Sequence, residues 1–103
     1  MAASDEPVRQ RAAQQETGHS RDLERPPLPE PLRTPVIDTH CHIDIHDGDA
    51  GAEWLGVGEA LARAASVGVT RVVQVGCDLP SARWSVLAAN EHEHLVATVA
   101  LHP

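Results

Sequence analysis

The sequence predicts an α/β fold in which a βαβαβ unit forms a parallel sheet, and three observations support this. Three short apolar segments, at 36–38, 69–75 and 95–101, alternate with two segments of helical periodicity. The apolar segments are hydrophobic at consecutive positions, which is typical of parallel strands buried on both faces. Right-handed crossovers through the helices are expected to connect these strands.

The length of 103 residues is enough for one small domain. It excludes a complete barrel of eight βα units, which needs roughly 250 residues. Three strands and two helices leave sheet edges unpaired and one face largely bare. We therefore expect the opening part of a larger α/β domain. A small complete domain that gains cover by oligomerising is the alternative.

Residues 1–34 are expected to form a disordered or extended tail, and residues 35–103 the folded part. Charged residues mix with prolines in the tail, and large apolar side chains are scarce there. The five prolines between Pro26 and Pro35 favour polyproline II. A short helix over Arg9–Glu16 is an alternative for part of the tail, and His19 is expected to have no function.

The first strand begins at Val36, and a loop rich in Gly and Asp follows at 47–51. Residues 59–67 predict a helix, and Gly68 stands where a helix C-terminus favours the left-handed conformation. The inner face of this helix is expected to consist of Leu61, Ala64 and Ala65.

The second strand, 69–75, is rich in β-branched residues and ends at Gly76. A second helix is predicted from Pro80 to about His92, with Asp78 as its N-cap. Its buried side is expected to consist of Trp84, Leu87 and Ala88. The third strand covers 95–101.

Negative charge is concentrated in the second part of the chain, where residues 36–103 hold nine acidic residues and three arginines. This balance excludes a protein that grips nucleic acid by a basic surface alone. If the substrate is a phosphate polymer, a metal ion must supply positive charge.

Two cysteines, Cys41 and Cys77, are too few for a disulfide scaffold. We expect reduced, buried thiols, with a bridge or a metal role as alternatives. The sequence has neither a signal-peptide pattern nor a run of about 20 apolar residues. We therefore expect a cytoplasmic protein without a membrane partner and without an obligate protein partner.

The segment Asp38-Thr39-His40-Cys41-His42-Ile43-Asp44 carries the candidate chemistry. Alternate residues of a strand share a face, about 6.5–7 Å apart. His40 and His42 are therefore candidate ligands of one metal ion. Asp38 and Asp44 are expected to orient the rings or hold a water. The alternative is a solvated edge strand.

Other titratable residues are weaker candidates. His102 ends the third strand on the same rim as the histidine pair, so it is a candidate substrate contact or supporting group, or simply a turn residue. Asp78 lies there too, and Glu91-His92-Glu93-His94 falls on the opposite rim, where we expect a solvated surface. Arg71 and Arg83 are expected to be surface charges.

Three segments together resemble the TatD family of metal-dependent hydrolases. Residues 36–44 resemble the opening of these enzymes, and 68–78 resemble their second strand and turn. Residues 100–103 are similar to the His-Pro that ends their third strand, although Ala100 stands where the family usually has Gly. The resemblance covers residues 35–103.

This resemblance implies the first part of a (β/α)8 barrel with one or two divalent metals at its C-terminal mouth. It places His40 and His42 on the first two metal ligands and His102 beside the site. Mg²⁺ is the expected metal, with Zn²⁺ or Mn²⁺ as alternatives. The family's bridging Glu, its two later histidines and its Asp have no counterpart here, so this chain is expected to contain no catalytic residue of its own.

The implied reaction is hydrolysis of ester bonds, with DNA or another phosphoester as substrate. Metal-activated water would attack phosphorus, and a late Asp would act as general base. We expect the 103 residues alone to bind metal weakly and to be inactive. Alternatives are a phosphoesterase or cyclic amidohydrolase that also begins D-x-H-x-H, and a truncated, non-catalytic α/β product or interaction module.

Overall fold

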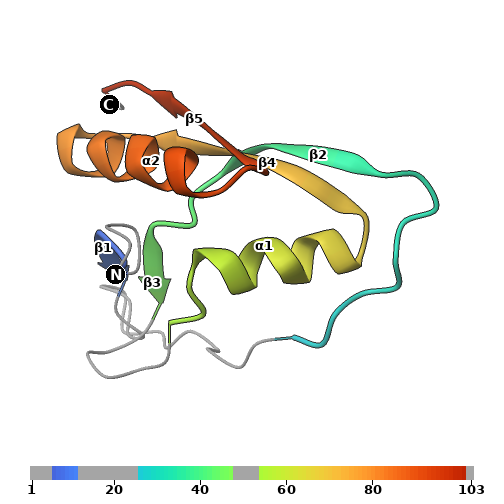
Figure 1. Ribbon diagram of the computed structural model, residues 1–103. Helices are drawn as coiled ribbons and strands as arrows, with labels where there is room; N and C mark the ends of the chain where they lie inside the picture. The colour runs from blue at the N-terminus through green and yellow to red at the C-terminus, as the bar shows by residue number, and fades with distance from the viewer. Residues whose placement is uncertain (1–5, 12–25, 48–53, 102–103) are drawn as a thin grey trace.

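A computed structural model of the chain describes residues 6–11, 26–47 and 54–101. Its main sheet has three parallel strands in the order β2 (Val36–Cys41), β4 (Val69–Gly76) and β5 (Leu95–Val99). Helix α1 (Val57–Ser66) links β2 to β4, and α2 (Leu79–Glu91) links β4 to β5 (Figure 1). The predicted βαβαβ order and parallel sheet are confirmed, and the sheet is open.

The ends of both helices follow from local sequence. Gly68 adopts a φ of 98° just after the C-cap of α1, as predicted from its position. Asp78 caps α2, with its carboxylate accepting from the backbone N–H of Ser81 at 2.8 Å. Each helix begins one or two residues earlier than predicted, and β5 ends at Val99 rather than at residue 101.

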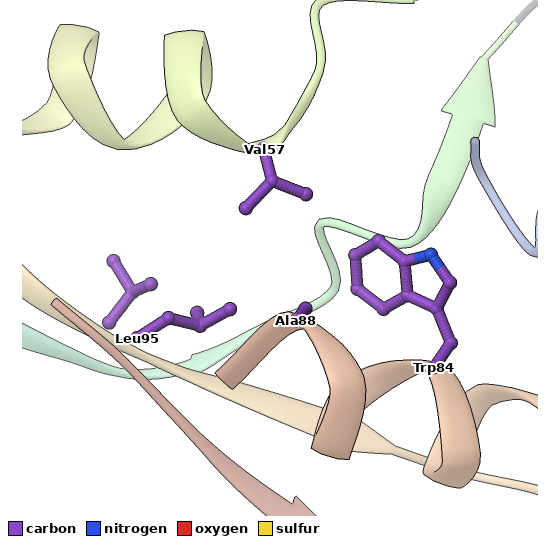
Figure 2. Close-up of a cluster of buried hydrophobic side chains, with 5 residues drawn as sticks. Val57, Trp84, Ala88 and Leu95 are labelled. Carbon is purple, nitrogen blue, oxygen red and sulfur yellow. The ribbon is translucent and has the colours of Figure 1, made fainter. Parts of the chain in front are cut away.

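The core lies between the sheet and the two helices, which cover the same face (Figure 2). Its buried side chains are Val57, Val72, Trp84, Ala88 and Leu95. Ala65 and Leu87, which were predicted to point inward, are exposed. On α2 the inner positions are instead taken by Ser81 and Ser85. The hydroxyl of Ser85 donates to the backbone carbonyl of Ser81, so this polar group is satisfied without water.

The opposite face of the sheet has no covering helix among the described residues. Val36, Ile37 and Val96 are 43%, 56% and 46% exposed. The expectation that the first strand starts buried is therefore wrong, because β2 is an edge strand of this sheet. The continuous apolar pattern correctly indicated a parallel sheet, but within residues 6–11, 26–47 and 54–101 helices cover only one face of that sheet.

A second, two-stranded sheet joins two distant segments. Strand β1 (Arg9–Arg11) pairs in parallel with β3 (Ile45–Asp47), and the two lie side by side in Figure 1. Residues 9–11 therefore form a strand rather than the start of a helix. His19 and residues 48–51 of the expected loop lie outside the described residues, and the division at residue 35 stays a prediction.

Candidate metal centre

The two histidines of the motif are brought together at the C-terminal end of β2. His40 is exposed on the strand, and His42 follows directly after it and is half-buried. Their ring centroids are 5.1 Å apart, and the rings meet edge to face at 84°. The two imidazoles thus lie side by side, as the sequence predicted, and their binding of one metal ion stays a prediction.

The orientation of His42 is set by the neighbouring strand. Its Nδ1 lies 3.0 Å from the backbone oxygen of Val75 on β4. A carbonyl oxygen can only accept, so this contact favours the tautomer with the proton on Nδ1 and the lone pair on Nε2. Metal-binding histidines commonly have one nitrogen hydrogen-bonded in this way and the other free for the ion.

Asp38 supports His40 through the backbone rather than through the ring. Its Oδ1 accepts from the backbone N–H of His40 at 3.0 Å, and its side chain is exposed. This local hydrogen bond fixes the chain just before the histidine pair. Among the described residues, this carboxylate is hydrogen-bonded to the His40 backbone, and its role in orienting the rings or holding a water stays a prediction.

Asp44 is separated from the imidazoles because the period-two alternation stops at Cys41. Residues 43 and 44 form a turn, and the Asp44 side chain is fully buried. Its carboxylate accepts from Gln74 Nε2 at 2.8 Å and from the guanidinium of Arg9. Asp44 therefore belongs to a buried hydrogen-bond network beneath the turn, and a contact with substrate stays a prediction.

Gln74 and Arg9 are the residues that sequence reasoning missed. Gln74 is completely buried, and its Oε1 accepts from the backbone N–H of Ile43 at 2.6 Å. The glutamine within the apolar sequence of β4 indicated that its side chain would be buried together with a polar partner. Nothing in the local sequence around Arg9 pointed to Asp44, which is 35 residues away.

Both cysteines are free thiols near this end of the sheet. They are half-buried rather than fully buried, and the Cys41 thiol donates to the carbonyl of Val73 at 3.3 Å. Burial, together with the nearby carboxylates, raises the pKa of Cys41 to about 11. Cys41 is therefore a neutral thiol at pH 7. The sulfur of the other cysteine, Cys77, lies 3.9 Å from Nδ1 of His42.

The donor set fits part of a coordination sphere. Imidazole nitrogen is a good ligand for zinc and other first-row divalent ions. Within residues 6–11, 26–47 and 54–101, no three His, Cys, Asp or Glu side chains converge on one point. His102, the third candidate, lies outside the described residues. The described part of the chain thus contains two of the predicted ligands, His40 and His42, and their role as ligands stays a prediction.

The other end of the sheet, where the parallel strands begin, has a different composition. Arg71, His92 and His94 line a cavity of about 310 Å³ there, together with apolar side chains of α1. Glu91, Glu93 and His94 are exposed, as expected of a solvated surface, and so are Arg71 and Arg83. No helix in the described ranges has the length and apolar character needed to cross a membrane.

Comparisons with known proteins identify the family of the chain. An uncharacterized metal-dependent hydrolase TatD of Mycobacterium tuberculosis is 42% identical over 71 residues, which is 66% of this chain. The chain spans about a quarter of that relative's length. No solved structure matches the chain. Residues 37–103 match the family of TatD related DNases, and the chain therefore belongs to the TatD family.

Proposed function

We propose that this chain supplies the first two metal ligands, His40 and His42, of a TatD-type hydrolase that cleaves DNA phosphodiesters. The observation that supports this most directly is the hydrogen bond from His42 Nδ1 to Val75. It leaves Nε2 available for an ion, and the centroid of the His40 ring lies 5.1 Å from that of the His42 ring. This contact favours the tautomer of His42 in which Nε2 can bind a metal ion.

The charge of the chain supports a role for the metal in substrate binding. Residues 36–103 carry nine acidic residues and three arginines, so the surface alone repels a polyanion. A bound divalent ion supplies both a nucleophilic water and positive charge at the phosphate. The contribution of His40 and His42 is to hold that ion at the carboxyl ends of the parallel strands.

The metal follows from the ligand type. Mg²⁺ prefers an octahedron of oxygen ligands and is seldom held by imidazoles. Two histidines favour Zn²⁺ or Mn²⁺, although the family resemblance led us to expect Mg²⁺ first. All three ions therefore belong in the binding experiment.

DNA is proposed as the substrate because the family's description names DNases. The catalytic base and the remaining ligands are expected outside these 103 residues, so this chain alone should bind metal weakly and show no turnover. We propose the cytoplasm as its location, since the free thiols Cys41 and Cys77 suit a reducing compartment.

Metal titration tests the proposal. Isothermal titration of the 103-residue chain with Zn²⁺, Mn²⁺ and Mg²⁺ should detect one site per chain for Zn²⁺ or Mn²⁺. His40→Ala and His42→Ala should each weaken it by about tenfold or more. His94→Ala removes an exposed histidine at the opposite edge and is the matched control. Equal affinity in all four chains would disprove the assignment of the ligands.

A nuclease assay tests the substrate. DNA degradation with each metal should be absent from the 103-residue chain. Metal-dependent degradation that survives His40→Ala would exclude the proposed site as its source.

A further inference from the structure

The segment Glu6–Arg11 is docked against the candidate metal centre, although it lies outside the part of the chain that matches the family. The backbone N–H groups of Val8 and Arg9 both donate to the carbonyl of Asp44, at 3.0 and 3.1 Å. The indole N–H of Trp84 donates to the carbonyl of Glu6 at 2.8 Å. Strand β1 then continues along β3, as Figure 1 shows.

Arg9 provides the counter-charge for Asp44. Its Nε and Nη2 form a two-pronged ion pair with the two carboxylate oxygens, and Nη2 lies 3.0 Å from Oδ1. The Asp44 side chain has no exposed surface, and Gln74 is its other polar side-chain partner among the described residues. A carboxylate buried in this way needs a cation, because the neutral amide of Gln74 does not compensate its charge.

The same guanidinium reaches the histidine pair. Arg9 Nη2 lies 3.4 Å from Nδ1 of His42, and in the tautomer favoured by Val75 this nitrogen donates its proton to the Val75 carbonyl. The guanidinium therefore packs beside the ring nitrogen instead of donating to it. The ring of His42 is thereby confined between the β4 backbone and the Arg9 side chain.

Asp44 links these two effects. Asp44 lies two residues after His42. Gln74 donates to the Asp44 carboxylate and accepts from the backbone N–H of Ile43, the residue between His42 and Asp44. The turn that follows His42 is therefore fixed from one side by Gln74 and from the other by Arg9. Without Arg9, the turn would retain one of these two supports.

We propose that Arg9 is a positioning residue of the metal centre, which holds the His42 ring and the turn at residues 43–44 in the metal-binding geometry. This inference rests on the proposed function for its metal-binding part. Arg9 touches neither substrate nor the reacting atoms in this role. It acts through Asp44 and through its contact with the His42 imidazole.

The first test needs no metal. Two-bond ¹H–¹⁵N NMR spectra of the metal-free chain report which nitrogen of His42 carries the proton. The unaltered chain should show the Nδ1–H form, and Arg9→Gln should show a mixture of both tautomers. Arg9→Lys keeps the charge but loses the planar fork, so it should lie between them. Arg33→Gln, which alters an exposed arginine, is the matched control.

The second test measures Zn²⁺ affinity by titration of the same variants. Arg9→Gln should weaken binding by about ten- to a hundredfold, as removal of residues that orient metal ligands does. Arg33→Gln should bind as the unaltered chain does. Failure of the unaltered chain to bind any ion would contradict the proposed function, whereas the tautomer experiment would still decide the role of Arg9.

A double variant separates positioning from general stability. Arg9→Gln combined with Asp44→Asn removes the charge that would otherwise be left buried, so the fold should be kept. If this variant gives a folded amide spectrum and still shows mixed His42 tautomers, Arg9 positions the ring. A folded double variant with the Nδ1–H form and unaltered Zn²⁺ affinity would overturn the proposal.

Discussion

The carbonyl of Val75 on β4 holds the imidazole of His42, which follows β2, with 3.0 Å between the oxygen and Nδ1. This hydrogen bond crosses between adjacent parallel strands at their carboxyl ends, where α/β folds place ligands. It depends on the register in which Cys41 pairs with Gln74. The candidate centre is thus assembled by strand pairing, and changes in β4 should affect it as much as changes in the motif.

Gly76 ends β4 where α2 begins, and we predict that Gly76→Ala destabilises the fold. A Cβ at this position would lie 2.7 Å from Cα of Ala82, a backbone atom that cannot rotate away. Overpacking of this kind costs about 1–3 kcal/mol. Urea denaturation followed by circular dichroism measures the loss.

Gly58→Ala is the matched control for this prediction. Its Cβ would meet only the edge of the His92 ring at 3.8 Å, within helix α1. It should leave stability unchanged or raise it by about 0.4–1 kcal/mol. If both variants unfold at the same urea concentration, the close approach of β4 to α2 is not the reason for glycine at position 76.

Features that depend on neighbouring residues could be predicted from the sequence. The cap at Asp78, the left-handed Gly68 and the pairing of His40 with His42 each rest on contacts within a few positions. The strand period correctly predicted that the two imidazoles lie close together, although His42 lies just beyond the end of β2 and is oriented by Val75 of β4. It could not show that the alternation ends before Asp44, because the turn at residues 43–44 depends on contacts with Gln74 of another strand.

Contacts between distant segments could not be predicted in this way. Arg9 reaches Asp44 across 35 positions, and no pattern around Arg9 indicates a strand. Leu87 was expected inside because it is apolar, yet it is 44% exposed. Helical spacing predicts which side of a helix is buried, to about one residue. Whether a residue at the border of that side is buried depends on how the helix packs on the sheet.

Asp78 gives a prediction about pH. Hydrogen bonds from the side chain and backbone of Ser81 lower the pKa of the Asp78 carboxyl below its ordinary value of 3.8. A group with a lowered pKa in the folded state stabilises that state above its unfolded pKa, and the effect is lost as pH falls through the folded pKa. The stability of the chain should therefore fall by this contribution below pH 3.8.

Two variants isolate this contribution. Asp78→Asn retains a capping oxygen but does not titrate, so the difference in stability between it and the unaltered chain should shrink below about pH 4. Asp78→Ala loses the cap and should have a lower melting temperature at neutral pH. If the stabilities of the unaltered chain and of Asp78→Asn differ by the same amount in strong acid and at neutral pH, the assignment is refuted.

The Cys41 thiol should resist alkylation at moderately alkaline pH. Its pKa is raised from 9.0 to about 11, chiefly by burial. The thiolate is the reactive form, so its fraction at pH 8 should be about a hundredfold lower than in the unfolded chain. Peptide mapping after iodoacetamide treatment, with and without urea, measures the ratio. Labelling of Cys41 at equal rates in both conditions would contradict this protection.

Trp84 should control the docking of the N-terminal segment. Its indole N–H donates to the carbonyl of Glu6 at 2.8 Å, while its ring is buried in the core. Trp84→Phe keeps most of the apolar volume but removes the donor, which should cost about 1 kcal/mol of stability. The amides of Val8 and Arg9, which donate to the carbonyl of Asp44, should then exchange faster with deuterium. Without the hydrogen bond to Trp84, the N-terminal segment that carries these amides should separate from Asp44 more often.

The same exchange experiment contains its own control. The amide of Val72 donates to the carbonyl of His94 within the main sheet, away from the N-terminal segment. Its protection should change only by the global loss of stability, whereas that of Val8 and Arg9 should fall further. Trp54→Phe, which alters the other tryptophan, should leave the relative protection of these amides as it is in the unaltered chain. Equal loss of protection at all three amides in Trp84→Phe would mean that the segment unfolds only with the whole sheet, and that its link to Trp84 adds no local stability.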